Sequence, residues 1–343
     1  MKDVIVGVVG IGRIGRMHVH NLVHRVPQAR VKAVASPHID VEWAHQMDIP
    51  VATTDADELF HDPELQAIVI ASPSGRHVEL IRRAAHSGKH IYCEKPVAFE
   101  EEPIREAMDA VQKAGVQLQV GFNRRFDPSI CRLADAVRGG DVGSVEGLRI
   151  VNRDPSAPPI DFVRRSGGMF FDFTIHDFDT ARFLSGSEIV EVYAAAAVLI
   201  DPEIGAAGDI DTALLTVRLA NGALCTIDNS RQTNYGYDQR FEVFGSKGNL
   251  VVDNLRPTSM EAYLESGVFA DRPLPSFPDR YQDAFIRELE AFIGCVADSS
   301  PVSVTAADAL ASVRAATAAR TSMLENRPVQ VAPVMTTIEG VGP

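Results

Sequence analysis

Short apolar runs alternate with longer amphipathic stretches along the first 120 residues of the chain. The runs are rich in valine, isoleucine and alanine, which is typical of buried strands, and the stretches between them have helical spacing. Strands that alternate with crossover helices predict a parallel, doubly wound sheet of the α/β class. The predicted strands are residues 4–9, 31–35, 67–71, 89–93 and 116–120, and the predicted helices are 13–25, 41–46, 76–87 and 101–114.

The pattern changes after Gly121. From residue 145 to about residue 263 the chain is strand-rich, with Asn221-Gly222 as a strong hairpin signal between the runs 213–219 and 223–228. A second turn at residues 246–248 separates the runs 241–244 and 250–252. Such pairing is antiparallel, and two helices at 280–297 and 306–325 complete an α+β domain. We therefore expect two domains, residues 1–122 and 123–343.

The net charge and the cysteine spacing argue against several kinds of partner and of site. The net charge of −13 argues against nucleic acid and anionic membranes, and the apolar run 4–9 is too short to span a bilayer. The cysteines lie far apart and form no CxxC pair, so they are expected to be reduced thiols of a cytoplasmic protein rather than disulfides or zinc ligands. They are Cys93, Cys131, Cys225 and Cys295.

A glycine-rich turn joins the first predicted strand to the first predicted helix. Its sequence is Gly10-Ile11-Gly12-Arg13-Ile14-Gly15, the GxGxxG pattern of dinucleotide-binding folds. Gly10 permits the tight turn, Gly12 lets the backbone approach the pyrophosphate, and Gly15 allows the helix to pack closely on the strand. The free N–H groups and the dipole at the helix start favour the phosphates. The turn therefore predicts a bound dinucleotide.

The end of the second strand leaves the choice of dinucleotide open. NAD-binding folds place an acidic residue there for the ribose 2′-hydroxyl, but this chain has Ser36, and the nearest carboxylate is Asp40. A serine does not repel a 2′-phosphate, and Arg13 would add positive charge beside it. We therefore expect NADP to be tolerated or preferred. In the alternative, Arg13 points to solvent and NAD binds through other groups.

Two further clusters carry candidate chemistry. Glu94-Lys95-Pro96 follows the strand 89–93, and ligands of open α/β sheets bind outside the carboxyl ends of strands. Lys95 is therefore expected beside the nicotinamide, where an ammonium group polarises a reacting oxygen. The expected cofactor contacts are Gly10, Gly12, Arg13, Ile14, Gly15, Ser36, Ser72, Glu94 and Lys95.

The second cluster is a run that contains Asp172, His176 and Asp179. On one helix, these residues share a face at i, i+4 and i+7. A histidine beside carboxylates accepts a hydroxyl proton near neutral pH while a carboxylate orients its ring. A core helix with a satisfied histidine is one alternative, and a metal site is another. Because nothing else supplies further ligands, we expect no metal.

These motifs together resemble the glucose–fructose oxidoreductase/inositol dehydrogenase (Gfo/Idh/MocA) family, and the resemblance covers nearly the whole chain. Within the family the chain is most similar to bacterial inositol 2-dehydrogenases. The resemblance rests on the glycine turn, Glu94-Lys95-Pro96, residues 121–127, Gly167-Gly168 and the Asp172…His176…Asp179 run, with residues 153–155, 235–238 and 244–248 in the substrate domain.

The resemblance implies a Rossmann domain followed by a domain with a large, mostly antiparallel open sheet, often assembled into homotetramers through that sheet. It implies a cis Lys95-Pro96 peptide and a catalytic set of Lys95, Asp172 and His176. Substrate hydroxyls would be held by Arg124, Asp154, Asp179, Tyr235 and Tyr237.

The activity expected from this resemblance is NAD(P)-dependent oxidation of a ring hydroxyl of a cyclic polyol, with myo-inositol and its 2-keto product as the first choice. A scyllo-inositol dehydrogenase and an aldose or pyranose dehydrogenase are alternatives, since stereochemistry cannot be read from sequence. A dinucleotide-binding regulator without turnover and a metal-dependent lyase or hydrolase are alternatives of other classes.

Overall fold

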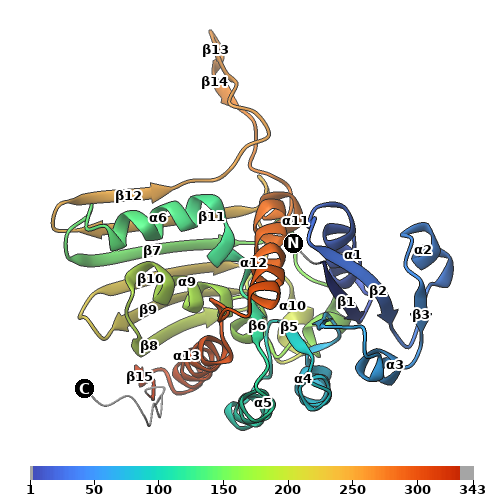
Figure 1. The fold of residues 1–343 in the computed structure, drawn as a ribbon. Coiled ribbons are helices and arrows are strands. Elements are labelled where there is room, and N and C mark those ends of the chain that lie inside the picture. The colour runs from blue at the N-terminus through green and yellow to red at the C-terminus, as the bar shows by residue number, and fades with distance from the viewer. Residues whose placement is uncertain (1–2, 333–343) are drawn as a thin grey trace.

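The computed structural model describes residues 3–332, which fold around two large sheets (Figure 1). The first sheet has six parallel strands in the order β3-β2-β1-β4-β5-β6, which confirms the predicted doubly wound domain. Its strands are β1 (Val4–Val9), β2 (Ala29–Ala35), β3 (Val51–Thr53), β4 (Ala67–Ile70), β5 (His90–Glu94) and β6 (Leu118–Gly121). Its helices are α1 (Arg13–His24), α2 (Val41–Gln46), α3 (Ala56–His61), η1 (Ser74–Arg76), α4 (His77–His86) and α5 (Glu101–Ala114).

Two of these elements were not predicted. Strand β3 has three residues, all half-buried at the edge of the sheet, so it lacks the apolar run that marks a buried strand. Helix α3 has six residues and is shorter than the window in which helical periodicity can be recognised.

The two faces of the first sheet are covered by different helices. Val4, Val6 and Val8 of β1 pack in one core cluster with residues of α1 and with Leu289 and Phe292 of α12. The opposite face packs on α4 and α5 through residues such as Ile81 and Ile104. Helix α12 (Gln282–Asp298) follows the second sheet in the chain but completes the core of the first, so the boundary at residue 122 does not separate two independent cores.

The second sheet has seven strands in the order β12-β11-β7-β10-β9-β8-β15. Only β10 and β7 pair in parallel, so the sheet is mostly antiparallel as expected. Its strands are β7 (Val145–Arg153), β8 (Ile189–Ala197), β9 (Thr212–Leu219), β10 (Leu224–Ser230), β11 (Asp238–Gly245), β12 (Gly248–Val252) and β15 (Val329–Gln330). The helices of this half are η2 (Asn123–Phe126), α6 (Pro128–Arg138), α7 (Ile160–Val163), α8 (Met169–Asp172), α9 (Ile175–Ser185), α10 (Pro202–Ala206), α11 (Phe277–Arg280), α12 and α13 (Ala306–Glu325).

One face of this sheet is packed and the other is open. Along β9, Ala213, Leu215 and Val217 are buried, whereas the residues between them are exposed. The buried side chains belong to the same core cluster as residues of α9 and α13. The alternation is that of an antiparallel sheet that is covered on one face only.

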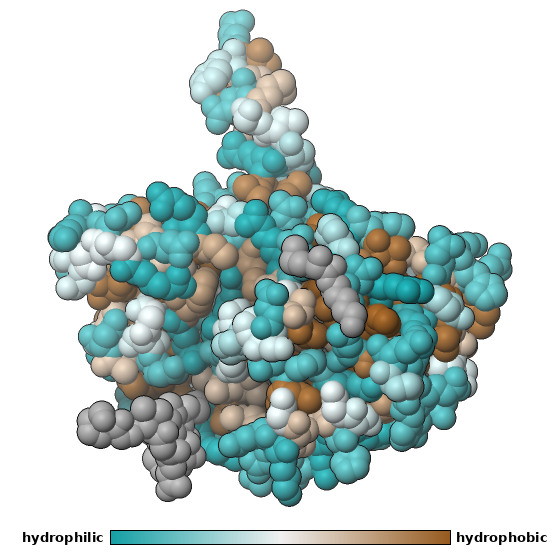
Figure 2. All heavy atoms as spheres, viewed as in Figure 1, coloured by the Kyte–Doolittle hydropathy of each residue, from teal (hydrophilic) through white to brown (hydrophobic). Residues whose placement is uncertain are grey.

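A separate hairpin projects from the body of the molecule (Figures 1 and 2). It consists of β13 (Glu261–Leu264) and β14 (Gly267–Ala270), which pair only with each other. Among residues 3–332, no helix is both long enough and apolar enough to cross a membrane.

Candidate active site

The glycine turn has the backbone geometry that a dinucleotide requires. Gly10 has a φ of +92°, and a Cβ on Gly15 would lie 1.8 Å from the carbonyl oxygen of Gly10, so neither position accepts a side chain. A Cβ on Gly12 would meet no atom within 4 Å, and this residue is exposed at the start of α1. The turn therefore leaves an open backbone surface at a helix N-terminus, which fits a pyrophosphate.

The end of β2 carries Ser36, whose backbone N–H donates to Thr53 in β3 at 3.1 Å. Arg13 does not turn toward it; its guanidinium lies over the ring of Phe277 at 4.9 Å. Arg16, one turn along α1, donates to Asp40 at 2.8 Å. Asp40 also caps α2, so the nearest carboxylate to Ser36 is already engaged.

The loops after β4 and β5 are tied together by His77. One ring nitrogen lies 2.8 Å from the carbonyl oxygen of Ser72, and the other lies 2.9 Å from that of Pro96. The Lys95-Pro96 peptide is cis, as the family resemblance implied. The Ser72 hydroxyl is buried without a hydrogen-bond partner among the described residues.

Lys95 faces Asp172 of the second domain. Its Nζ donates to the backbone carbonyl of Asp172 at 2.6 Å and lies 3.6 Å from the carboxylate. Both side chains are largely but not fully buried. Their charges therefore attract in a setting where water screens them only partly, which holds the ammonium group at this position.

Arg231 links Asp172 to Asp154, and sequence reasoning missed it. Its guanidinium donates to the Asp172 carboxylate at 3.1 Å and lies 3.6 Å from the Asp154 carboxylate. Burial raises the pKa of Asp154 to about 7, and the charge of Arg231 opposes that rise. Arg231 immediately follows β10, so its place at the end of a strand was the available signal.

His176 is half-buried against the ring of Phe122, with the ring centroids 6.1 Å apart. Its Nδ1 is buried without a hydrogen-bond partner within residues 3–332. Burial lowers the pKa of the imidazole well below its usual range, and the positive charges of Lys95 and Arg124 lower it further. The ring is therefore neutral near pH 7 and able to accept a proton.

The prediction that Asp172, His176 and Asp179 share a single helix is wrong. Asp172 ends the short helix α8, the turn residues Phe173 and Thr174 follow, and His176 lies in the first turn of a second helix, α9. Helix α8 follows two glycines with positive φ, Gly167 and Gly168, and is capped by Asp209, which accepts from the N–H of Met169 at 2.9 Å. Asp172 and His176 therefore stand on two consecutive helices, at the end of the first and in the first turn of the second.

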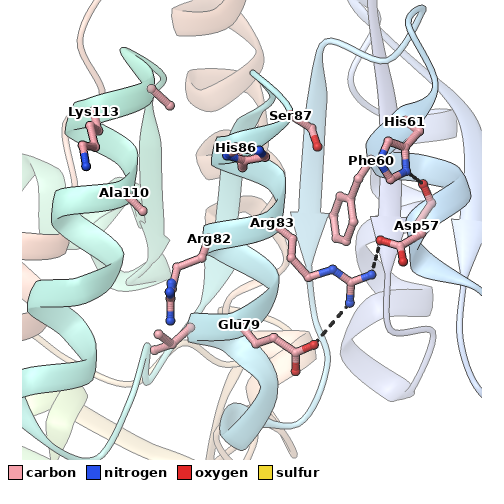
Figure 3. Close-up of a pocket in the computed structure, with 12 residues that line it drawn as sticks. Asp57, Phe60, His61, Glu79, Arg82, Arg83, His86, Ser87, Ala110 and Lys113 are labelled. Atoms are coloured by element: carbon pink, nitrogen blue, oxygen red, sulfur yellow. Dashed lines mark hydrogen bonds and ion pairs between the residues drawn. The ribbon is translucent and has the colours of Figure 1, made fainter.

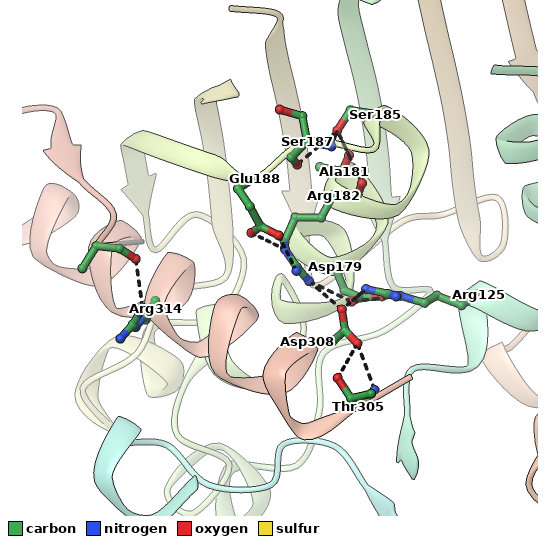
Figure 4. Close-up of polar contacts among 11 residues, drawn as sticks. Arg125, Asp179, Ala181, Arg182, Ser185, Ser187, Glu188, Thr305, Asp308 and Arg314 are labelled. Carbon is green, nitrogen blue, oxygen red and sulfur yellow. Dashed lines mark hydrogen bonds and ion pairs between the residues drawn. The ribbon is translucent and has the colours of Figure 1, made fainter. Parts of the chain in front are cut away.

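Asp179, which was expected to hold a substrate hydroxyl, is engaged by arginines in this structure. Asp179 is buried, and both of its oxygens accept from Arg125, at 2.6 and 2.9 Å (Figure 4). Arg125 and Arg182 also reach Asp308 of α13, at 2.8 and 3.2 Å. This network joins α9 to α13 and engages both carboxylate oxygens of Asp179.

Arg124 lies in a second buried network. Its terminal nitrogens donate to Asp177 at 2.5 Å and to Gln239 at 2.8 Å. The other oxygen of Asp177 accepts from Asn152 and from Asn229, each at 2.9 Å. Both ends of the Arg124 fork are therefore occupied, and its effect on the site is the positive charge that it contributes near His176.

The two predicted tyrosines lie in different surroundings. Tyr237 is buried, with its ring 6.2 Å from that of Tyr281. Tyr235 is exposed, donates to Asp238 at 2.6 Å, and accepts from Arg153 at 3.3 Å. Tyr235 lines a cavity of about 370 Å³ whose walls include none of Lys95, Asp172 and His176.

Glu94 belongs to a buried cluster that sequence reasoning also missed. Its carboxylate accepts from Tyr92 at 3.2 Å and lies 2.7 Å from a ring nitrogen of His18. Glu288 of α12 is fully buried beside them, and neither of its carboxyl oxygens has a hydrogen-bond partner in the described part of the chain. Burial raises the pKa of Glu288 well above its usual range, and the charge of Glu94 adds to the rise.

A larger concavity, of about 980 Å³, lies elsewhere (Figure 3). Its walls come from α3, α4 and α5, and several of its charges are already paired, as in the contact of Arg83 with Glu79 at 3.2 Å. It contains none of the residues at the carboxyl ends of the strands. Size alone therefore does not identify the active site.

Comparison with known proteins agrees with this geometry. Residues 4–122 match an oxidoreductase family with an NAD-binding Rossmann fold, and residues 130–251 match a GFO/IDH/MocA C-terminal domain. The chain is 43% identical to an inositol 2-dehydrogenase of Rhizobium meliloti over 95% of this chain and 98% of that one. It is 41% identical to a myo-inositol 2-dehydrogenase of Thermotoga maritima over 96% and 99%.

A solved structure of an inositol dehydrogenase also matches this chain over nearly its whole length. Scyllo-inositol dehydrogenase of Lactobacillus casei, crystallised with NAD(H) and scyllo-inositol, superposes with a TM-score of 0.90 at 30% identity and covers 97% of this chain and all of that one. Both halves of the chain and its whole length therefore match one group of enzymes, and the chain belongs to the GFO/IDH/MocA family of oxidoreductases.

Proposed function

We propose that this protein oxidises a ring hydroxyl of a cyclic polyol, with NAD(P) as the hydride acceptor and an inositol as the substrate. The observation that carries the proposal is the position of Lys95 just after β5, where it contacts Asp172 and lies near enough to His176 for its charge to lower the pKa of the imidazole. It is supported by relatives that act on inositols and are 41–43% identical over nearly the whole chain.

The chain's own groups divide the proton chemistry between them. The neutral imidazole of His176 accepts the hydroxyl proton as the alcohol is oxidised. Lys95 donates one hydrogen bond to Asp172, and its remaining N–H groups stabilise negative charge on the reacting oxygen. Asp172, fixed by Arg231, holds Lys95 in place and stabilises the imidazolium that forms.

The glycine turn, Ser36, Ser72 and Glu94 would hold the dinucleotide, and the nicotinamide supplies the hydride acceptor. Ser36 presents no carboxylate to a 2′-phosphate, and the nearest one, Asp40, is neutralised by Arg16. We therefore propose that NADP is accepted as well as NAD. Arg13 stacks on Phe277 and is not assigned to the 2′-phosphate.

Asp154 is proposed to accept a hydrogen bond from a substrate hydroxyl, because its carboxyl group lies beside Asp172 and is partly exposed. A site with several paired polar groups suits a polyol, since a hydroxyl without a partner is costly to bury. Myo-inositol is the first choice. Scyllo-inositol is the second, favoured by the match to the Lactobacillus casei enzyme.

The decisive experiment is a matrix of initial rates for inositol isomers and aldoses, each with NAD and with NADP. One inositol should exceed the aldoses by at least tenfold in kcat/KM; equal rates across all polyols would refute the substrate assignment. His176→Ala and Lys95→Ala should each lose turnover while cofactor binding, measured by calorimetry, persists. Substantial turnover in either variant would refute the mechanism, and loss of activity with EDTA would favour a metal enzyme instead.

We also propose a homotetramer in the cytoplasm. The free state of all four cysteines supports a reducing compartment. The open face of the second sheet supports assembly, because an uncovered sheet face with exposed apolar residues is a typical interface.

A further inference from the structure

We propose that His77 is a positioning residue, which holds the loop that carries Lys95 against the loop that carries Ser72 and thereby sets the ammonium group relative to the dinucleotide. His77 opens α4 and is 1% exposed, so both of its ring nitrogens face protein rather than solvent. Nε2 lies 2.8 Å from the carbonyl oxygen of Ser72, and Nδ1 lies 2.9 Å from that of Pro96. Pro96 directly follows Lys95, so the ring contacts the chain one residue away from the lysine.

The two loops leave neighbouring strands at the edge of the sheet where a dinucleotide binds. Strands β4 and β5 are adjacent and parallel, so the loops that follow them start at the same edge. Ligands of open α/β sheets bind outside the carboxyl ends of such strands. The backbone ladder between the two strands ends with Ile70 opposite Cys93. Beyond that pair, His77 supplies a contact that keeps the loops together.

His77 lies in the middle of a line of contacts that joins the glycine turn to the second domain. On one side, the loop with Ser72 packs against the turn so closely that a Cβ on Gly10 would lie 2.6 Å from the backbone nitrogen of Ser72. On the other side, Nζ of Lys95 donates to the backbone carbonyl of Asp172 at 2.6 Å. The imidazole therefore connects the backbone that would hold the pyrophosphate to the side chain that would contact the reacting oxygen.

The ring acts as a hydrogen-bond donor and not as a charge. Burial lowers the pKa of His77, although the carbonyl groups of Ser72 and Pro96 oppose this effect, so the imidazole is neutral near pH 7. A neutral imidazole has one N–H to donate and adds no positive charge beside Lys95. A buried carbonyl that loses its donor is costly, so we expect the loop to shift when the donor is removed.

The test compares His77→Asn with His77→Leu, because asparagine and leucine are nearly equal in shape. Asparagine places an amide N–H close to the position of Nδ1, which faces Pro96, whereas leucine has no donor. At saturating cofactor and polyol, kcat should be roughly tenfold higher in His77→Asn than in His77→Leu, because misplacing a reacting group by about 1 Å can cost about a hundredfold in rate. The polyol KM should agree between the two variants within about threefold, since Lys95 acts on charge that develops in the transition state.

A single-turnover experiment separates positioning from a loss of folded protein. With enzyme in excess over polyol, formation of the reduced nicotinamide should have a lower rate constant in His77→Leu but the same amplitude, whereas a partly unfolded sample loses amplitude. His86→Leu is the matched control, because His86 is exposed at the other end of α4; it should keep the wild-type rate constant. Circular dichroism checks that each variant is folded. If His77→Leu is not, His77→Ala replaces it, since alanine also lacks the donor.

Equal rate constants in His77→Asn and in the variant without a donor, or a difference confined to the amplitude, would overturn the proposal. Because the effect on Lys95 rests on the proposed function, one further measurement needs no polyol. In calorimetry, the Kd for the dinucleotide should rise several-fold in His77→Leu but not in His77→Asn, because the loop with Ser72 borders the glycine turn. If the wild type oxidises no polyol but dinucleotide affinity follows the donor, the proposed function fails and the contact between the loops stands. If polyols are oxidised but neither the rate constant nor the affinity follows the donor, the positioning role fails and the function stands.

Discussion

Replacement of Asp154 by asparagine tests the electrostatics of the site most directly. The carboxyl group lies 3.6 Å from Arg231, keeps 22% of its side-chain surface exposed, and has a pKa of about 7 because burial disfavours its charge. It therefore changes from neutral to anionic between pH 6 and pH 8. His176 does not titrate in this range, because its pKa lies well below its usual value.

The expected magnitude follows from the hydrogen bond that Asp154 would accept from the substrate. A bond to a charged group contributes about 1.5–3 kcal/mol and a neutral one about 0.5–1.5 kcal/mol, so ionisation gains about 1–1.5 kcal/mol. That difference is roughly a five- to thirteenfold change in kcat/KM. The wild-type enzyme should gain this factor between pH 6 and pH 8, and Asp154→Asn should remain flat.

The assay is kcat/KM for the preferred polyol at saturating cofactor, measured in steps of half a pH unit. Asp161→Asn is the matched control, because this carboxylate is 87% exposed on α7. It should keep the wild-type profile. An inflection near pH 7 that survives in Asp154→Asn, or a wild-type profile without one, would show that Asp154 does not bind the substrate as an anion.

Three further predictions concern the cofactor and the buried networks. Ser36→Asp should reduce kcat/KM with NADP at least tenfold while NAD is retained, since a carboxylate repels the 2′-phosphate; an unchanged cofactor ratio would place that phosphate elsewhere. Asp179→Ala should lower the urea-derived unfolding free energy by about 1–3 kcal/mol, because it removes the two-oxygen partner of the buried Arg125 and leaves that guanidinium with Asp308 alone. An Asp179→Ala variant that is as stable as wild type but inactive would instead support direct contact between Asp179 and the substrate. Glu288→Gln should be at least as stable as wild type at pH 8, because a raised folded-state pKa costs stability above the unfolded value, whereas Glu288→Ala should lose about 1–3 kcal/mol. A glutamine variant less stable than the alanine variant would contradict the neutral form of Glu288.

The periodic elements of the fold were accessible from sequence because their signals are local. The runs at 4–9, 41–46 and 101–114 coincide with β1, α2 and α5 to the residue. The role of α12 was not accessible. Its amphipathic pattern shows that the helix buries one face, but not that the face completes a sheet formed some 170 residues earlier, as the contact between Gln119 and Glu288 shows.

The residues of the candidate site also fall into two groups, those with a local sequence signal and those without one. Lys95 and His176 were found because each stands in a recognisable run, whereas Arg231 and Glu288 acquire their meaning only from partners that are distant in sequence. Asp179 was assigned to substrate by the family resemblance, and helical spacing placed it on one face with His176. Spacing does not reveal a buried arginine that uses both oxygens of the carboxylate.

The charges around His176 explain why the pH prediction has a single direction. Lys95 and Arg231 each carry a positive charge near Asp172, so the group bears one net positive charge while Asp154 is protonated. Ionised Asp154 lowers this positive charge by one. A less positive surrounding opposes the formation of imidazolium less, so ionisation of Asp154 makes His176 a better base as well as strengthening the bond to substrate. Both effects raise oxidation above pH 7, and Asp154→Asn removes both together.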